Sequence, residues 1–303
     1  MRSQFINTLF RRTYQTGARE RPRKRALAIH DLPCFGKGLL TAALPILSAA
    51  GIETAVLPTA VLSARRDRFP DGTYRGLAGD IPKIQEHWKS LGLKFDGICT
   101  GDLSSPEQVK AVSALIGGFQ KEDTLVLVNP DMADGGKLYP HLDGTFPAEM
   151  RNLCGRANIL VLNLTEASLL LKEPYLKGPY KRVYVDSILK KLGGLGPEKI
   201  VLTGVRFDAA HPGAAAYDTK NGEIDYVLSD CTEGDCRGAE DVFASALFAA
   251  LLNDFPLVKA ARIAADFTVE GIRRTRAAGS DFRFGISFEA GIPDFLKALK
   301  LLG

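Results

Sequence analysis

The stretch ALAIHDLPCFGKGLLTAALPILSAAGIETAVLPTAVL, residues 26–62, decides the fold of the chain. It opens with a short aliphatic run (26–30), continues with a segment whose apolar residues recur at helical spacing (38–51), and ends in a second run rich in aliphatic and β-branched residues (53–62). A helix of this length between two strands is the usual crossover of a parallel pair. The stretch therefore predicts a β-α-β unit.

The rest of the chain continues this alternation. Further strands are expected at 95–101, 124–130, 159–163 and 199–205, and helices at 81–92, 106–120, 146–157, 183–196, 241–252, 257–275 and 289–301. An antiparallel pair joined at Asn221-Gly222 follows the strand at 199–205. Because no repeat or low-complexity linker divides this region, we expect one domain over residues 26–303. Its architecture should be a three-layer α/β/α sandwich around a mostly parallel sheet.

Composition favours a soluble, cytoplasmic protein with no membrane partner. The chain has 303 residues, of which 46% are hydrophobic, so it can bury a large core. No apolar stretch is long enough to cross a bilayer, and nothing at the start has the apolar middle of a secretory signal. The five cysteines are odd in number and mostly spread out, which favours a reducing compartment. Cys231 and Cys236 are interpreted as ordinary loop thiols, because no second Cys or His cluster completes a zinc site.

The basic character of the chain lies in its first 25 residues. This segment holds eight Lys and Arg residues and one acid, whereas the other 278 residues carry 31 basic and 34 acidic groups. We predict a flexible basic extension at 1–25. Two alternatives remain open, an organelle-targeting peptide and, less favoured, a surface for nucleic acid or membrane lipids.

The segment CRGAEDVFASALFAALL, residues 236–252, places Glu240 and Asp241 in front of an almost wholly apolar helix. A helix that starts at Gly238 presents unpaired backbone N–H groups and the positive end of its dipole, which suits a phosphate. An acid at this point can accept a proton from a substrate hydroxyl while the amides hold the transferred phosphoryl group. On the residues alone, Asp241 as a simple helix cap is an equally open interpretation.

Polar residues also follow the other predicted strands. Ligands of parallel α/β sheets bind outside the carboxyl ends of the strands. The candidate residues at these ends are Asp31, Thr59, Asp102, Asn129, Asp131, Asn163, Glu166 and Thr203. For Asn163 and Glu166, a helix cap and a first-turn acid is the alternative interpretation.

The chain resembles the pyridoxal/pyridoxamine kinase branch of the ribokinase-like superfamily. The stretches that carry the resemblance run in the family's order, and they are IHDLPCFGKGLLTAALPILSAAGIETAVLPTAVLS (29–63), FDGICTGDLSSPEQV (95–109), LVNPDMADGGKLY (127–139), LNLTEASLLL (162–171), VLTGV (201–205) and GAEDVFASAL (238–247). The resemblance covers residues 26–300.

The resemblance implies transfer of the γ-phosphoryl group of ATP to the 5′-hydroxymethyl group of a vitamin B6 vitamer. It implies ATP and Mg²⁺ as cofactors, a monovalent cation such as K⁺ as an optional one, and a homodimer. The resemblance implies that Asp241 is the base and that Gly238, Ala239 and Glu240 surround the anion hole. It places Asp31, Thr59 and Asp102 at the substrate, and Asn163, Glu166 and Thr203 at the ATP phosphates. The metal ligands that it implies are Asn129, Asp131 and Glu166.

Several of these positions depart from the family pattern. Glu240 replaces the second glycine of Gly-x-Gly-Asp, Asn129 replaces a carboxylate, and Asp102 replaces an aromatic residue. Asp131, if the segment is extended, lies about 7 Å further along the same face than residue 129. Two alternatives therefore stay open. One is a weak or inactive paralogue that binds a vitamer, a nucleotide or a partner protein, and the other is a kinase for a related hydroxymethylpyrimidine.

Four weaker features complete the sequence predictions. Gly36-Lys37-Gly38 lacks the full phosphate-loop spacing and is interpreted as a loop with a solvated Lys. Asp134-Gly135-Gly136-Lys137 predicts a turn. The Arg residues at 65, 66 and 68 are interpreted as a solvated run, with contacts to phosphates as the alternative. The four His residues, at 30, 87, 141 and 211, show no metal-ligand spacing.

Overall fold

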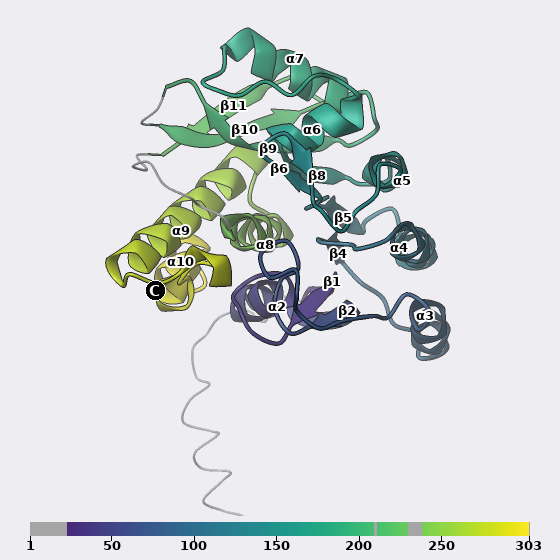
Figure 1. Cartoon of the computed structure of the whole chain (residues 1–303). Helices are drawn as coiled ribbons and strands as arrows, with labels where there is room; N and C mark the ends of the chain where they lie inside the picture. Colours follow the sequence, from purple (N-terminus) through teal and green to yellow (C-terminus); the bar gives the residue numbers. More distant parts are fainter. Residues whose placement is uncertain (1–22, 209–210, 230–237, 303) are drawn as a thin grey trace, which may run out of the picture.

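The computed structural model describes residues 23–208, 211–229 and 238–302. Most of the predicted basic extension, as well as Cys231 and Cys236, lies outside these ranges. The described residues form a single large sheet with helices on both of its faces, together with one small hairpin (Figure 1).

The central sheet is mostly parallel. Its strands are β1 (Arg25–Pro33), β2 (Glu53–Leu62), β3 (Tyr74–Gly76), β4 (Gly97–Thr100), β5 (Leu125–Val128), β8 (Ile159–Asn163), β9 (Lys199–Arg206), β10 (Pro212–Asp218) and β11 (Ile224–Leu228). They lie in the order β11-β10-β9-β8-β5-β4-β1-β2-β3. Neighbouring strands from β9 through β8, β5, β4 and β1 to β2 pair in parallel. At the edges of the sheet, β3, β10 and β11 pair antiparallel to their neighbours. A separate two-stranded sheet pairs β6 (Ala133–Asp134) with β7 (Lys137–Leu138).

The helices form the two outer layers. One face of the sheet carries α2 (Leu40–Ala49), α8 (Ala239–Leu252), α9 (Leu257–Ala277) and α10 (Ile292–Ala298), and the other carries α3 (Ile81–Ser90), α4 (Pro106–Phe119), α5 (Phe146–Cys154), α6 (Leu164–Leu171) and α7 (Arg182–Gly193) (Figure 1). Residues of β1 alternate between the two cores, with Ala26 and Ala28 facing the α8 side and Leu27 and Ile29 the α4 side. This alternation is the period of two that a strand buried on both faces requires.

The predicted three-layer α/β/α architecture is confirmed. The antiparallel pair β10–β11 lies around Asn221-Gly222, where Gly222 has a positive φ of 77°. The turn predicted at 134–137 joins β6 to β7. The helix predicted at 289–301 is shorter, since a 3-10 turn at Glu289–Gly291 precedes α10. Short elements, namely β3, β6, β7 and α6, were not predicted, because each is too brief to show a period.

Helix α8 is buried nearly all round, as its sequence suggests. It packs on the sheet between α2 and α9, and its small residues, Ala244, Ala246, Ala249 and Ala250, allow close approach. The approach to the sheet is closest at Gly97 of β4, where a Cβ atom would lie 2.6 Å from Cζ of Phe248. Glycine at this point lets α8 lie directly on the strand. The first turn of α8 is thereby held at the carboxyl ends of the central strands.

Within the described ranges, no helix combines the length and the apolar character needed to cross a membrane.

Candidate active site

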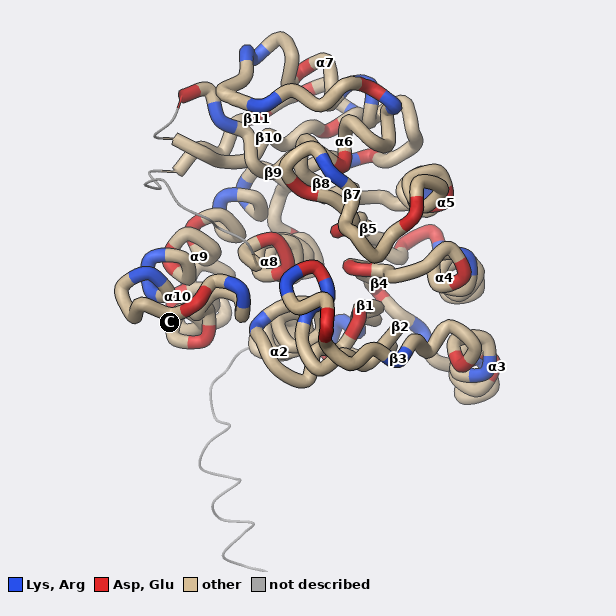
Figure 2. The backbone as a smooth tube through the Cα atoms, in the orientation of Figure 1, with Lys and Arg blue, Asp and Glu red and all other residues tan. Residues whose placement is uncertain are grey.

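Acidic residues gather where the parallel strands end. Figure 2 shows acidic segments after β4 and β5 and in the first turn of α8, all facing the mixed basic and acidic loop that follows β2. This is the edge at which ligands bind in parallel α/β sheets. Most of the polar residues singled out from the sequence lie here.

Gly238 begins α8 in a conformation that favours glycine. Its φ is 88° and its ψ is 2°, in the left-handed region. A Cβ atom at this position would lie 2.9 Å from Cα of Gly285 and 3.2 Å from Nη1 of Arg68. Glycine at 238 therefore allows the start of α8 to pack closely against Gly285 and Arg68.

Asp241 does not act as a helix cap. The residue is buried, with 1% of its surface exposed, and its Oδ2 accepts a hydrogen bond of 2.6 Å from Nη1 of Arg65. Its Oδ1 is buried and has no hydrogen-bond partner. The capping interpretation is therefore wrong.

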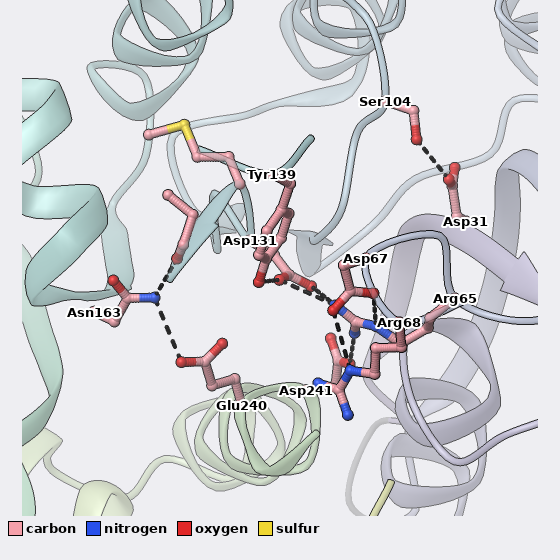
Figure 3. A network of polar contacts seen from close by, with 12 residues as sticks. Asp31, Arg65, Asp67, Arg68, Ser104, Asp131, Tyr139, Asn163, Glu240 and Asp241 are labelled. Atoms are coloured by element: carbon pink, nitrogen blue, oxygen red, sulfur yellow. Dashed lines mark hydrogen bonds and ion pairs between the residues drawn. The ribbon is translucent and has the colours of Figure 1, made fainter. Parts of the chain in front are cut away.

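Arg65 is the centre of a buried ion-pair network that joins three carboxylates (Figure 3). Besides Asp241, its Nε donates to Oδ1 of Asp67 at 3.0 Å, and its Nη2 donates to Asp131 Oδ1 at 3.2 Å and Oδ2 at 3.1 Å. Although burial alone would lower it, the pKa of Arg65 is raised well above its usual value by Asp131, Asp67 and Asp241. The guanidinium is therefore a fixed positive charge.

The interpretation of residues 65–68 as a solvated run is wrong. The side chain of Arg68 is also buried, and it bonds to Oδ2 of Asp67 at 3.0 Å and to the carbonyl of Phe282 at 3.0 Å. The guanidinium of Arg66 lies 4.3 Å from the ring centroid of Tyr74. The error arose because a run of charges is usually solvated, whereas here the facing strand ends supply buried carboxylates.

Asp131 lies within the network rather than along an extended segment. Its φ of 38° turns the chain, so the expected displacement of about 7 Å along a strand does not apply. Besides Arg65, Asp131 accepts a hydrogen bond of 3.0 Å from the hydroxyl of Tyr139. Burial raises its pKa, and the Arg65 charge opposes this rise.

A second network surrounds Asp31, which lies in β1 at a break in the pairing with β2 between His30 and Leu32. Such bulges re-aim side chains and are common beside active sites. Asp31 Oδ1 accepts from the Thr59 hydroxyl at 2.5 Å and Oδ2 from Ser104 at 3.0 Å. Burial raises the pKa of Asp31 to about 6, although these hydroxyls lower it.

Asp102 follows β4 and is buried, with an Oδ1 that has no hydrogen-bond partner. Burial, then the charges of Asp131 and Asp31, raise its pKa well above the usual value. His30 lies nearby in β1, and burial lowers its pKa to about 4. His30 is therefore neutral near pH 7, and the raised pKa of Asp102 favours its protonated form, which can donate a hydrogen bond as well as accept one.

Asn163 and Glu166 form a capping box at the start of α6. The side chain of Asn163 accepts from the Glu166 amide at 3.0 Å, and Glu166 Oε2 accepts from the Asn163 amide at 2.9 Å. Glu166 Oε1 accepts from the amide of Met132 at 2.9 Å. Burial, then the charge of Glu240, raise the pKa of Glu166 well above its usual value. The structural interpretation of this pair is confirmed, which leaves any role at phosphate a prediction.

Glu240 faces this capping box. Its Oε1 lies 3.5 Å from Nδ2 of Asn163, which also donates to the carbonyl of Ala133 (Figure 3). Burial, then the charges of Asp131, Asp134 and Asp241, raise the pKa of Glu240 to about 8. At pH 7 most Glu240 side chains are therefore protonated, so the repulsion expected from a glutamate at this position is reduced.

The predicted metal ligands are otherwise engaged. The oxygens of Asp131 are held by Arg65 and Tyr139, and those of Glu166 by two backbone amides. The Nδ2 of Asn129 is buried without a partner, but an amide nitrogen is not a metal ligand. In the described part of the chain, no group of three or more His, Cys, Asp or Glu side chains is arranged to hold a metal ion. These residues do not fit a resident Mg²⁺ in this arrangement.

Two further predicted residues lie at the margins of the site. Thr203 in β9 is half-buried, and its hydroxyl donates to the carbonyl of Leu162 at 3.2 Å. Lys37, in the loop before α2, contacts Ser287 and Glu289 at the surface, which agrees with a partly solvated Lys.

A small cavity of about 10 Å³ lies against Gly238, with room for about one water molecule. Arg65, Arg68 and Arg283 line it together with the rings of Phe35, Phe69 and Phe284. The ring of Phe284 packs against both other rings, at centroid distances of 5.1 Å and 4.9 Å. In this arrangement the cavity has no room for a phosphate group.

Sequence reasoning misinterpreted Arg65 as part of a solvated run, and it missed Asp67 and Tyr139. The available signal was the mixture of three Arg residues and one Asp at 65–68, directly after a strand. An acid within a basic run is a sign of internal pairing. Tyr139 gave no signal, because a tyrosine after a turn has many structural uses.

Comparison with known proteins identifies the family. The model of the phosphomethylpyrimidine kinase family matches residues 83–284. A candidate phosphomethylpyrimidine kinase from Bacteroides thetaiotaomicron is 33% identical, with a TM-score of 0.86, and the match covers 92% of this chain and 96% of that one. The same protein has been solved with pyridoxal. Among curated proteins, none matches this chain.

Two pyridoxal kinases share the fold. That from Lactobacillus plantarum is 27% identical, with a TM-score of 0.82, and the match covers 90% of this chain and 97% of that one. That from Leishmania donovani, solved with ADP and pyridoxamine, is 19% identical, with a TM-score of 0.81 and coverage of 90% and 95%. The chain therefore belongs to the phosphomethylpyrimidine kinase family and has the fold of the pyridoxal kinases.

Proposed function

We propose that this chain transfers the γ-phosphoryl group of ATP to the 5′-hydroxymethyl group of a vitamin B6 vitamer. Membership of a kinase family supports a phosphotransferase. The pyridoxal complex of the relative from Bacteroides thetaiotaomicron, at 33% identity, supports a B6 vitamer as the acceptor. ADP is bound in a pyridoxal kinase that shares the fold, which supports a nucleotide as the donor through the fold alone.

One observation carries the proposal: the buried Oδ1 of Asp241, at the start of α8, has no hydrogen-bond partner. Buried polar atoms are nearly always paired, and the exceptions are frequent at functional sites. Oδ1 would accept the proton of the acceptor hydroxyl while the amides from Gly238 onward hold the transferred group. Ala239 contributes such an amide.

The network around Asp31 suits the acceptor. Asp31 is held by Thr59 and Ser104, and its pKa of about 6 lets it accept or donate a hydrogen bond near neutral pH. The ring nitrogen and ring hydroxyl of a vitamer are matching groups. Asp102, whose pKa is raised by burial and by the charges of Asp131 and Asp31, would add a hydrogen-bonding carboxyl group near Asp31.

Mg²⁺ is proposed to arrive with ATP, as part of the substrate. Mg²⁺ usually keeps several waters and binds phosphates with few protein ligands. Glu240 and Asn163 lie where they would approach the phosphates. Binding of K⁺, a homodimer, a kinase domain at 26–303 and a cytoplasmic location remain predictions.

A hydroxymethylpyrimidine is the second candidate acceptor, and the family match favours it. This compound also carries a hydroxymethyl group on a heteroaromatic ring. A chain that binds without turnover is the other alternative, favoured by the Arg65 contact to Asp241.

The test is ADP release from Mg-ATP with pyridoxal, pyridoxamine, pyridoxine or hydroxymethylpyrimidine. We expect turnover with a vitamer in the wild type and its loss in Asp241→Ala, with Asp123→Ala at an exposed position as the control. Turnover with hydroxymethylpyrimidine alone would make this compound, and not a B6 vitamer, the acceptor. Absence of turnover in the wild type, with recovery in Glu240→Gly, would show a kinase scaffold that Glu240 inactivates. Absence in every variant would favour a binding protein.

A further inference from the structure

We infer that Arg65 is the positioning residue of the base: it holds Asp241 through Oδ2 and leaves Oδ1 as the atom that accepts the proton. This inference rests on the proposed function, because it assigns Asp241 as the base. It adds a residue from the loop after β2 to a reaction otherwise assigned to the start of α8.

The geometry fixes the guanidinium in three directions. Nε is bonded to Asp67, Nη1 to Asp241 and Nη2 to both oxygens of Asp131. Arg65 is 7% exposed and Asp131 and Asp241 are 1% exposed each, so solvent hardly competes for these bonds. A planar fork held by three carboxylates cannot rotate without breaking at least two contacts.

The two oxygens of Asp241 are thereby made different. Oδ2 is 2.6 Å from the guanidinium and lies close to Gly38, where a Cβ atom would be 2.9 Å from this oxygen and 3.6 Å from Nη1 of Arg65. Glycine at 38 is thus the residue that leaves room for this oxygen. Oδ1 is the oxygen left without a partner. A carboxylate anchored at one oxygen presents the other in one orientation, which is the arrangement a general base requires.

In the proposed transfer, each bond that breaks is matched by a bond that forms. The acceptor O–H bond breaks and its proton moves to Oδ1 of Asp241, while the acceptor oxygen forms a bond to the γ-phosphorus of ATP. The bond from that phosphorus to the β–γ bridging oxygen breaks, and ADP leaves with the electron pair. Arg65 stays protonated throughout, because its pKa is raised. Its charge stabilises the position of the carboxylate and takes no proton.

The experiment compares Arg65→Lys and Arg65→Met with Arg75→Lys and Arg75→Met, at an exposed position of β3. We expect kcat to fall about tenfold or more in Arg65→Lys and about a hundredfold or more in Arg65→Met, while KM for ATP and for the vitamer changes less than about threefold. A lysine cannot hold three carboxylates in one plane, so only partial rescue is expected. The Arg75 pair should match the wild type.

A double-mutant cycle of unfolding measurements tests the interaction between Arg65 and Asp241 without measuring enzyme activity. Asp241→Asn is combined with Arg65→Lys, and urea unfolding gives the coupling between the two sites. We expect the double variant to deviate from additivity by more than about tenfold in the unfolding equilibrium constant. If Arg65→Met fails to fold, the lysine variant still supplies both readouts.

The outcomes separate the two proposals. A wild-type or higher kcat in folded Arg65→Met would overturn the inference, and a rise would mean that the ion pair restrains the base. A change confined to KM would also overturn it, because Arg65 would then bind substrate. If the wild type phosphorylates no acceptor, the proposed function fails, and only the unfolding cycle tests whether Arg65 holds Asp241. Additive effects of the two substitutions would overturn that interaction, whereas coupling between them would support it.

Discussion

The two polar networks of the site differ in how their charges are compensated. Around Asp31, hydroxyl groups satisfy both carboxylate oxygens, and Gln108 ties the same region to the backbone of Thr59 at 2.7 Å. Around Asp241, three buried carboxylates share the guanidinium groups of Arg65 and Arg68, and of these two only Arg65 pairs with Asp131 and Asp241. The first network is locally complete, whereas the second holds excess negative charge and unpaired atoms. Completeness suits recognition of a ligand ring, and incompleteness suits a reaction centre that still has to receive a charged group.

The largest effect should come from the second network. Asp241→Asn removes the proposed proton acceptor and keeps the shape of the side chain, so kcat should fall by about 10²- to 10⁴-fold. Binding of the vitamer, measured by fluorescence titration, should change little because the first network is intact. An Asp123→Asn control should have wild-type kcat. Equal losses in binding and kcat would mean that the two networks are not separable.

Thr59→Val breaks the first network at one bond. It leaves an oxygen of Asp31 unpaired, so the free energy of unfolding should fall by about 1–3 kcal/mol in urea denaturation. The Thr59 hydroxyl lowers the pKa of Asp31, so its loss should raise that pKa above about 6. If the vitamer binds the ionised carboxylate, the acid limb of its binding profile moves to higher pH. Thr73→Val, at an exposed position, is the control, and an unmoved limb would exclude Asp31 from binding.

Glu240→Gln probes the excess charge of the second network. The pKa of Glu240 is 4.5 in an unfolded chain and about 8 in the folded one, so the folded state holds the proton more tightly. The wild type therefore loses stability as pH rises from about 4.5 to about 8. Relative to the wild type, Glu240→Gln should gain up to about 4 kcal/mol at pH 8 and nearly nothing at pH 4.5. Chemical denaturation across this range measures the difference, with Glu122→Gln as the exposed control; parallel curves for wild type and variant would refute the shift.

The smallest effect is expected at Asn129. Asn129→Asp adds a carboxylate beside an already acidic network, so the free energy of unfolding should fall by about 1 kcal/mol without divalent ions. Mg²⁺ should restore part of this loss in the variant and none in the wild type, as a rise of the thermal midpoint of about 2–4 °C. Asn152→Asp on the surface of α5 serves as the control. A wild-type response equal to that of the variant would reveal a metal site that uses other residues.

The fold could be predicted because its signals are local. The run of residues 26–62 contains a strand, a helix and a strand in order, and the helical spacing recurs through the chain. The polar strand ends could be predicted as well, since parallel strands bring their carboxyl ends to one edge. Asp31, Asp131, Asn163 and Asp241 do meet there.

The pairing of these residues could not be predicted. Arg65 and Asp241 are separated by 176 positions, and no local sequence pattern at either residue indicates that the two side chains pair. The positive φ of Asp131 depends on tertiary contacts and overrides the extended geometry expected of a segment after a strand. Burial of charges is decided by the final packing, so the acid within the basic run at 65–68 can indicate internal pairing but does not identify Asp131 and Asp241 as the partners of Arg65.

The close contact of α8 with β4 links the reaction centre to the core. Asp241 and Phe248 are seven residues apart, about 10 Å along one rigid rod, and Phe248 lies where a Cβ at Gly97 would collide with it. A bulkier residue at 97 would require the side chains of Phe248 and Leu252 to move, and any shift of α8 that follows would change the position of Asp241 relative to Arg65. Gly97→Ala should therefore slow turnover while acceptor preference stays the same. The geometry around Asp241 can thus depend on a residue in the interior of a strand, at the other end of α8.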